Sequence, residues 1–285
     1  MLRLTLPWIW NHPLGCRNRP AAYGRYLFWQ LRHRFNSKSF VLPWVNNTRL
    51  ALEPRMAGAT GNYYCGLHEW PDMAFVLHLL RPEDSFADIG ANVGSYTVLA
   101  SGAVGCHTEA FEPVPVTYER LLSHIELNEI SHLVHPHQVA VGAKQGSLFF
   151  SIDRDSMNQV VAADYPGLSK ELPVLAVDQL PALRHSVCWK LDVEGHEQAL
   201  LAGAQETLRD APPAAILCED RSEPVAKCLL EAGFQIYNYN PWTRELRPDP
   251  SGSASCSNQL WVRDQDFVQA RLLTAPAFSV FGQQI

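Results

Sequence analysis

The sequence predicts an α/β protein built on a doubly wound, mainly parallel sheet. From about residue 61 onward, strand patterns alternate with helix patterns, which is typical of βαβ units. A glycine-containing turn at 88–94 follows one of these strands and opens a helix, at the position where open α/β sheets bind ligands. The last two predicted strands are joined without a helix, which indicates a C-terminal antiparallel hairpin at one edge. With 285 residues, of which 47% are hydrophobic, the chain can bury a full core.

Short apolar runs predict the strands, and apolar residues at helical spacing predict the helices. Strands are expected at 85–89, 108–111, 137–141, 147–152, 186–193, 215–218, 234–239 and 258–262. Helices are expected at 95–103, from Pro115 onward, at 196–209 and at 225–232. Pro115 suits the first turn of its helix, because the first N–H groups of a helix have no partner within it. The apolar residues from Tyr118 to Ile125 then follow at the i, i+3, i+4, i+7 spacing.

The first 60 residues form a basic, aromatic-rich N-terminal extension, and we place the main domain at 61–285. The extension holds nine Lys or Arg residues and one acid, Glu53, whereas the remainder holds 14 basic and 28 acidic residues. Residues 23–35 are expected to form one amphipathic helix. We interpret the extension as a cap on the main domain, with a substrate lid or a peripheral contact with an anionic membrane surface as alternatives. Nucleic acid is not expected as a partner, because the main domain is acidic and has no recognition motif.

Cysteine usage and the absence of long apolar runs indicate the compartment. Seven cysteines with no C-x-x-C pair argue against a disulfide framework or a zinc knuckle and favour a reducing compartment. No run approaches ~18 apolar residues, so no transmembrane helix is expected. The apolar start of the chain is interrupted by Pro7, Asn11 and Pro13, and no small-residue cleavage site follows. We therefore expect a cytoplasmic protein, and no feature indicates an oligomeric state.

Asp88-Ile-Gly-Ala-Asn-Val-Gly94 is the most informative stretch. Gly90 permits a tight turn, and Gly94 lets a ligand approach the backbone closely. The stretch is not the G-x-G-x-x-G pattern of dinucleotide sites, and Asp88 at the strand end would repel a pyrophosphate but suits a cationic ligand. Glu112 ends the next predicted strand, 24 residues beyond Asp88, near the spacing at which an acid binds ribose hydroxyls.

Trp189-Lys-Leu-Asp-Val-Glu-Gly-His-Glu197 carries a third group of polar residues. Asp192 lies near a strand end, with Glu194 and His196 on the turn that follows, so all three overhang the same sheet edge as Asp88. Carboxylates this close raise one another's pKa values unless they are paired or bind a ligand. The alternative for Glu197 is a helix N-terminal acid stabilised by the helix dipole.

These motifs, in this order and spacing, resemble those of the FkbM-type S-adenosylmethionine-dependent methyltransferases. The resemblance runs from about residue 66 to 262 and includes Asn128, Ala140-Val-Gly142 and Asn258-Gln-Leu260. It implies a Rossmann-like sheet of the class I methyltransferase type. It also implies methylation of sugar or polyketide hydroxyls with S-adenosyl-L-methionine as the methyl donor. The N-terminal extension lies outside the resemblance.

The methyl donor is expected at the first two strand ends, because it carries cationic sulfonium and ammonium groups and a ribose diol. The expected cofactor contacts are Asp88, Gly90, Ala91, Asn92, Gly94, Ser95, Glu112, Pro113, Ala140, Val141 and Asp192. His196 is the expected general base for a small-molecule hydroxyl acceptor, because imidazole titrates near neutral pH. Asp192 is expected to orient His196 or to hold the acceptor, with Glu194 as the reserve catalytic residue.

Three alternatives stay open at this point. A metal-assisted methyltransferase would bind Mg²⁺ or Mn²⁺ through oxygen ligands. The candidate metal ligands are Asp192, Glu194, Glu219 and Asp220. A NAD(P)-dependent oxidoreductase could use the same sheet, although Asp88 and the missing third glycine argue against it. The third alternative is a non-catalytic cofactor-binding protein. The intact set of Asp88, Glu112 and Asp192 argues against it.

Overall fold

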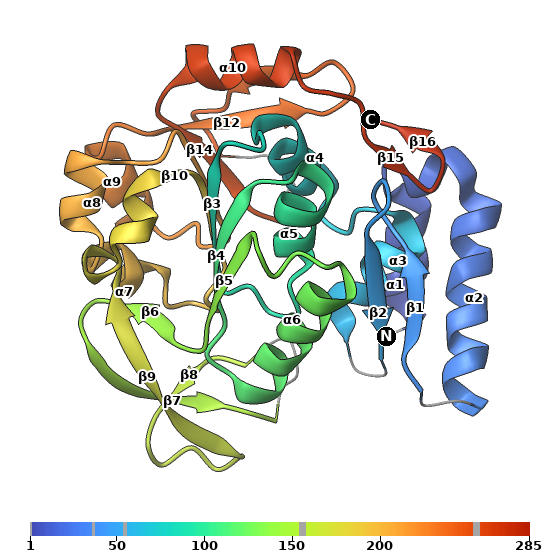
Figure 1. Cartoon of the computed structure of the whole chain (residues 1–285), viewed down its shortest axis with the longest axis horizontal. Coiled ribbons are helices and arrows are strands. Elements are labelled where there is room, and N and C mark those ends of the chain that lie inside the picture. The colour runs from blue at the N-terminus through green and yellow to red at the C-terminus, as the bar shows by residue number, and fades with distance from the viewer. Residues whose placement is uncertain (1, 36–37, 54–55, 154–157, 253–256) are drawn as a thin grey trace.

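Figure 1 shows the fold as a computed structural model, which describes residues 2–35, 38–53, 56–153, 158–252 and 257–285. At its centre is an eight-stranded sheet with the strand order β13-β12-β14-β11-β10-β3-β4-β5. These strands are β3 (Ser85–Ile89), β4 (His107–Phe111), β5 (Val134–His137), β10 (Ser186–Leu191), β11 (Ala215–Cys218), β12 (Gln235–Asn240), β13 (Glu245–Pro248) and β14 (Gln259–Val262). The strands from β5 to β11 pair in parallel, whereas β14 is antiparallel to both β11 and β12. The predicted doubly wound sheet with an antiparallel C-terminal edge is confirmed.

Apolar residues on both faces of the strands place the core in two layers, one on each side of the sheet. Phe86 on β3 and Cys188 on β10 belong to the first buried cluster. Their neighbours Ala87 and Trp189 point to the opposite face and belong to the second cluster. The helices on the first face are α4 (Trp70–Leu79), α5 (Ser95–Thr97), the π-helix η2 (Val98–Val104), α6 (Pro115–Leu127) and α10 (Gln265–Leu273). The helices on the other face are α7 (Glu197–Ala202), α8 (Gln205–Asp210), α9 (Glu223–Glu231), η4 (Val177–Gln179) and η5 (Pro181–His185).

Three predicted elements differ from the structure, the first being the helix expected at 95–103, which is divided into α5 and the π-helix η2. The strand expected at 137–141 is wrong in extent, because the edge strand β5 ends at His137 and β6 (Ala140–Gly142) belongs to a second sheet of order β6-β9-β7-β8. The other strands of that sheet are β7 (Gly146–Ser151), β8 (Val160–Val161) and β9 (Ser169–Ala176). The helix expected at 196–209 is broken between α7 and α8 at Gly203. A Cβ on Gly203 would lie 2.2 Å from the carbonyl oxygen of Gly142, so close packing on β6 requires glycine there.

The N-terminal extension packs into the first layer of the core. Its elements are α1 (Leu2–Asn11), η1 (Gly15–Asn18), α2 (Arg19–Phe35), β1 (Phe40–Pro43), β2 (Arg49–Leu52) and α3 (Ala57–Cys65), and a C-terminal hairpin of β15 (Ser279–Val280) and β16 (Gln283–Gln284) lies beside them (Figure 1). The helix expected at 23–35 is confirmed as part of α2. Ile9, Trp29 and Leu50 are buried in the same cluster as residues of α4 and η2. The boundary expected after residue 60 falls inside α3.

Side chains of α6 attach the extension to the main domain through β2. Asn128 accepts a hydrogen bond from the N–H of Arg49 at 2.7 Å and donates one to the carbonyl oxygen of Arg49 at 2.9 Å. His124 Nε2 accepts from the N–H of Ala51 at 2.9 Å, and its Nδ1 bonds the carbonyl oxygen of Val93 at 2.7 Å. These bonds satisfy backbone groups at the edge of β2. No helix in the described ranges is long and apolar enough to cross a membrane.

We expect the extension and the main domain to unfold as one unit, because they share a buried cluster. Leu50→Ala should lower the global free energy of unfolding by about 2–5 kcal/mol through the cavity it opens. Val41→Ala on the neighbouring strand β1 is the matched control. Val41 is 46% exposed, so its truncation should cost less than about 0.5 kcal/mol. Urea unfolding followed by fluorescence and circular dichroism measures the free energy of unfolding of both variants. A separate early transition of the extension in Leu50→Ala would contradict the expectation.

Candidate active site

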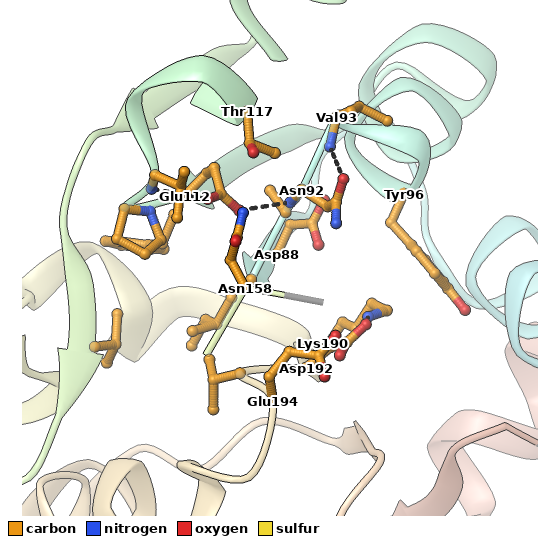
Figure 2. Close-up of a pocket in the computed structure, with 18 of the residues that line it drawn as sticks. Asp88, Asn92, Val93, Tyr96, Glu112, Thr117, Asn158, Lys190, Asp192 and Glu194 are labelled. Carbon is orange, nitrogen blue, oxygen red and sulfur yellow. Dashed lines mark hydrogen bonds and ion pairs between the residues drawn. The ribbon is translucent and has the colours of Figure 1, made fainter. Parts of the chain in front are cut away.

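A cavity of about 350 Å³ lies at the carboxyl ends of β3, β4, β10 and β11. Figure 2 shows Asn92 and Glu112 on one side of this cavity and Asp192 and Glu194 on the other. The predicted site residues that line it are Asp88, Gly90, Ala91, Asn92, Ser95, Glu112, Pro113, Ala140, Val141, Asp192, Glu194, His196 and Glu219. The structure therefore brings residues of all three motifs together around one space.

The turn after β3 has a shape that requires glycine. Gly90 has a φ of 84°, and a Cβ there would lie 1.8 Å from the carbonyl oxygen of Asp192. The N–H groups of Gly90 and Ala91 both donate to the carbonyl oxygen of Phe111, at 3.0 and 2.9 Å. The N–H of Asp192 donates to the carbonyl oxygen of Ile89 at 3.0 Å. These contacts hold the ends of β3, β4 and β10 against one another.

Gly94 has a packing role in the structure that we did not predict. It does not line the cavity, and its φ of 88° places it as the left-handed residue before α5. A Cβ on Gly94 would lie 2.6 Å from Cδ1 of Leu121 on α6. The absence of a side chain on Gly94 allows α6 to pack closely on the start of α5, and the expected ligand contact at Gly94 stays a prediction.

Asp88 is buried at the end of β3, and only one of its oxygens has a partner. Oδ2 accepts a hydrogen bond from Oγ1 of Thr97 at 2.6 Å, whereas Oδ1 has no partner among the described residues. Burial raises the pKa of Asp88, and the positive charge of Lys190 partly opposes this shift. A buried carboxylate oxygen without a partner costs free energy. This atom therefore favours a cationic or hydrogen-bond-donating ligand in the cavity.

Glu112 shapes the turn and also lines the cavity. Its Oε2 accepts from the N–H of Asn92 at 3.1 Å, and its Oε1 accepts from the N–H of Val114 at 2.9 Å (Figure 2 shows the first bond). Burial raises the pKa of Glu112 to about 7 despite these two hydrogen bonds. Each carboxylate oxygen can accept two hydrogen bonds. Both oxygens therefore keep acceptor capacity for hydroxyl groups of a ligand.

Asp192 pairs with Lys190 and has no hydrogen bond to His196 in the described chain, which favours the second expected role of Asp192, holding the acceptor. Its Oδ2 lies 2.6 Å from Nζ of Lys190, which is buried on β10 beneath the ring of Tyr96. Burial works against the charge of Asp192, but the Lys190 charge and a hydrogen bond with Glu219 lower its pKa overall. Burial, followed by the hydrogen bond and charge of Asp192, raises the pKa of Glu219 to about 8. The two shifts run in opposite directions and favour the ionised form of Asp192 and the protonated form of Glu219.

His196 and Glu194 lie on the turn between β10 and α7. His196 has no hydrogen-bond partner in the described part of the chain, and an added Cβ on Gly142 would lie 3.2 Å from its Nε2. Partial burial lowers the pKa of His196, which favours the neutral form of its imidazole. Glu194 has a φ of 53°, a conformation that costs a residue with a side chain free energy. Burial and then the charge of Asp192 raise the pKa of Glu194.

Several lining residues were not predicted from the sequence. They are His68, Glu69, Met73, Tyr96, Thr117, Phe150, Asn158 and Lys190. Glu69 Oε2 accepts from the Tyr96 hydroxyl at 2.5 Å and from Asn258 Nδ2 at 3.4 Å, so two donors fix this carboxylate. The role of Lys190 could have been found, because it lies on β10 two residues before Asp192, which directly follows the strand, so the two side chains share a face. Glu69 could not have been found from the sequence, because the loop before α4 has no pattern that indicates a site.

The chain belongs to the FkbM methyltransferase family. The model of the methyltransferase FkbM domain matches residues 88–239, which is more than half of the chain. The match contains the three motifs on which the resemblance was based, and together with the strand order it confirms the Rossmann-like fold of the class I methyltransferase type. The protein is therefore a methyltransferase. A comparison with curated proteins found no match.

Solved structures that are similar to this chain include two TYW2 proteins and a methyltransferase. TYW2 of M. jannaschii in complex with AdoMet is 13% identical, with a TM-score of 0.42 over 80% of this chain and 85% of that one. TYW2 of P. horikoshii in complex with MeSAdo is 13% identical, with a TM-score of 0.41 over 80% and 70%. The precorrin-6y C5,15-methyltransferase of Geobacter metallireducens is 11% identical, with a TM-score of 0.40 over 70% and 90%. These likenesses concern the fold alone.

The contact between Gly90 and Asp192 can be tested against a matched glycine. Gly105 has a similar φ of 92° but open space around it. Gly105→Ala should therefore cost only the left-handed strain of about 1–2 kcal/mol. Gly90→Ala should cost clearly more, because its Cβ pushes the ends of β3 and β10 apart. Urea unfolding of both variants measures the difference, and equal losses would show that this contact is not tight.

Proposed function

We propose that the protein is an S-adenosylmethionine-dependent O-methyltransferase that acts on a hydroxyl group of a sugar or another polyhydroxylated small molecule. The proposal rests on the distribution of polar side chains around the cavity, with carboxylates at the ends of β3 and β4 and an imidazole on the turn after β10. Asp88 and Glu112 present buried carboxylates at the ends of β3 and β4, while the neutral imidazole of His196 lines the same space. The carboxylates suit a cationic nucleoside, and the imidazole suits removal of a proton from an alcohol.

The residues at the β3 and β4 ends have the chemistry that S-adenosylmethionine needs. Oδ1 of Asp88, buried without a partner among the described residues, offers an acceptor to a cationic group. Glu112 keeps acceptor capacity for a ribose diol, and Ala140 with Val141 adds an apolar surface for a base. A dinucleotide would instead bring a pyrophosphate to the Asp88 carboxylate, which would repel it. When bound, S-adenosylmethionine supplies an electrophilic methyl group.

The walls of the cavity favour a neutral, hydroxyl-rich acceptor. Six of its lining residues are Asp or Glu, and Lys190, the one Lys or Arg among the described lining residues, is paired with Asp192. Such a cavity repels phosphate groups, which disfavours nucleic acid and phosphorylated acceptors. Carboxylates and the Asn158 amide can bond the hydroxyls of a sugar without an opposing charge.

Transfer of a methyl group to an alcohol requires loss of the hydroxyl proton as the new bond forms. We assign this proton to His196, because its neutral imidazole lines the cavity without a competing partner in the described chain. General-base catalysis of this kind contributes ~10²–10⁴-fold. Asp192 is held ionised by Lys190 and can position the acceptor by accepting a hydrogen bond from it. Glu194 on the same turn is the second candidate to contact the acceptor, and alignment of the reactants contributes the remainder of the rate.

We do not propose a metal site at Asp192 and Glu219. Nζ of Lys190, 2.6 Å from Oδ2 of Asp192, already occupies a position that a cation would take. The raised pKa of Glu219 disfavours the deprotonated form that a metal ligand takes. Within the described ranges, no group of three or more His, Cys, Asp or Glu side chains is arranged to hold a metal ion.

Binding of S-adenosylmethionine should depend on Asp88 and Glu112. Asp88→Asn keeps an acceptor for the Thr97 hydroxyl but removes the charge, and Glu112→Ala removes the diol acceptor. Each change should weaken binding by about 10–100-fold, the usual effect of losing a charge-assisted hydrogen bond. Glu119→Gln, an exposed carboxylate on α6, is the control. Isothermal calorimetry with S-adenosylmethionine, and with NAD as the rival ligand, measures the effect; undiminished binding in both variants would place the cofactor elsewhere.

Turnover should depend on His196 in a pH-dependent way. Burial lowers the pKa of His196, so the wild-type rate should fall only on the acid side of neutrality, where the base becomes protonated. His196→Ala should lower kcat by ~10²–10⁴-fold at neutral pH, lose this acid limb and recover partly at alkaline pH. Gln198→Ala, exposed on α7, should leave the rate unchanged, and a chelator should not inactivate the wild type. Near-normal kcat in His196→Ala would assign the proton to another group, such as the Asp192–Glu219 pair.

A further inference from the structure

Helix α2 has two apolar faces, and only one of them packs in the core. Ala22, Tyr26 and Trp29 are buried on the inner face. The outer face carries Leu27, Phe28, Leu31 and Phe35, whose side chains are between 47% and 86% exposed. Their i, i+1, i+4, i+8 spacing aligns them in one stripe along the helix. Figure 1 shows α2 at the outer edge of the molecule, with α1 and α3 on its inner side.

Helix α1 adds two exposed apolar side chains next to this stripe. Leu6 and Trp10 are 36% and 51% exposed. The Tyr23 hydroxyl on α2 donates to the carbonyl oxygen of Leu6 at 3.0 Å, and the Trp10 ring lies 6.5 Å from the Tyr23 ring. We call the surface of Leu6, Trp10, Leu27, Phe28, Leu31 and Phe35 the α1–α2 face. Single exposed apolar residues are common on proteins, but a contiguous group of six marks an interaction surface.

The charges around the α1–α2 face are of one sign. Residues 1–52 contain eight Lys or Arg and no Asp or Glu. Within the described part of the chain, none of the four arginines of α2 forms an ion pair with a carboxylate. Arg34 is exposed on α2 itself, and the guanidinium of Arg19 stacks 4.1 Å from the Trp10 ring at one end of the face. The positive charge beside the apolar stripe is therefore available to an anionic partner.

We propose that the α1–α2 face binds an anionic lipid surface, with α2 lying in the plane of the interface. Exposed Leu, Phe and Trp side chains insert among acyl chains, and flanking arginines contact anionic headgroups. The exposed leucines of the stripe give no advantage in binding a nucleic acid, which uses basic and stacking groups. A second copy of the chain would bring two faces of the same positive charge together, which opposes self-association through this surface.

The test is co-sedimentation of the full-length protein with vesicles of phosphatidylcholine alone or with about one-third phosphatidylglycerol. We expect binding only with phosphatidylglycerol present, and weaker binding at higher salt because screening reduces the headgroup attraction. The double variant Leu31→Ser/Phe35→Ser should weaken binding by at least about 10-fold. Its matched control is Leu168→Ser/Leu230→Ser, which removes two similarly exposed apolar side chains from the main domain. Arg34→Glu should also weaken binding, whereas Arg247→Glu on β13 should not.

Any of the following results would overturn the proposal. No binding to anionic vesicles, or equal binding with and without phosphatidylglycerol, would remove the charge argument. Equal losses in the α2 and main-domain variants would show that the face is not the contact. Light scattering of the same proteins distinguishes a self-interface: a dimer that Leu31→Ser/Phe35→Ser dissociates would assign the face to a second copy. Circular dichroism of the variants checks that α2 is intact.

Discussion

The contact between the turns after β3 and β10 is the constraint on which the rest of the site depends. Gly90 lies directly beside the carbonyl oxygen of Asp192, and the Asp192 N–H in turn bonds the carbonyl oxygen of Ile89. Because β3 and β10 pair in register, Asp88 and Lys190 are neighbours across the sheet. The same backbone contact that closes the sheet edge therefore crowds the charged side chains of two motifs into one cavity. Neither motif would form a site alone.

Burial of carboxyl groups works against the stability of the folded chain. Burial raises the pKa values of Glu112 and Asp72 to about 7. At pH values between the ordinary carboxyl pKa and about 7, these two groups therefore hold more protons in the folded protein than in the unfolded chain. Stability from these groups therefore falls as the pH rises through that range. Asn258 limits the cost at Asp72 with two hydrogen bonds to one oxygen, at 3.1 and 3.0 Å. Such opposition between stability and local charge is common where a site must bind a polar ligand.

The sequence predicted the sheet and most of the cavity because both follow from local patterns. Apolar runs and strand-to-helix turns are contiguous in the chain, so β3, β10 and the residues around Gly90 could be found without the structure. The split between β5 and β6 could not, because it depends on pairing with β9, far along the chain. The Lys190–Asp192 pair, in place of an Asp192–His196 pair, depends on which rotamer a buried lysine adopts. Glu69 comes from a loop whose place is set only by tertiary packing.

Helix α1 connects the proposed lipid-binding face with the cavity. Its outer side exposes Trp10, whereas Trp8 packs 5.0 Å from the ring of His68, which lines the cavity. His12, at the end of the helix, contacts the carbonyl oxygen of the same residue at 3.3 Å. A displacement of α1 at the outer face would therefore also move His68 in the wall of the cavity. The extension thus contributes to the geometry of the site through packing, although none of its own side chains needs to touch a ligand.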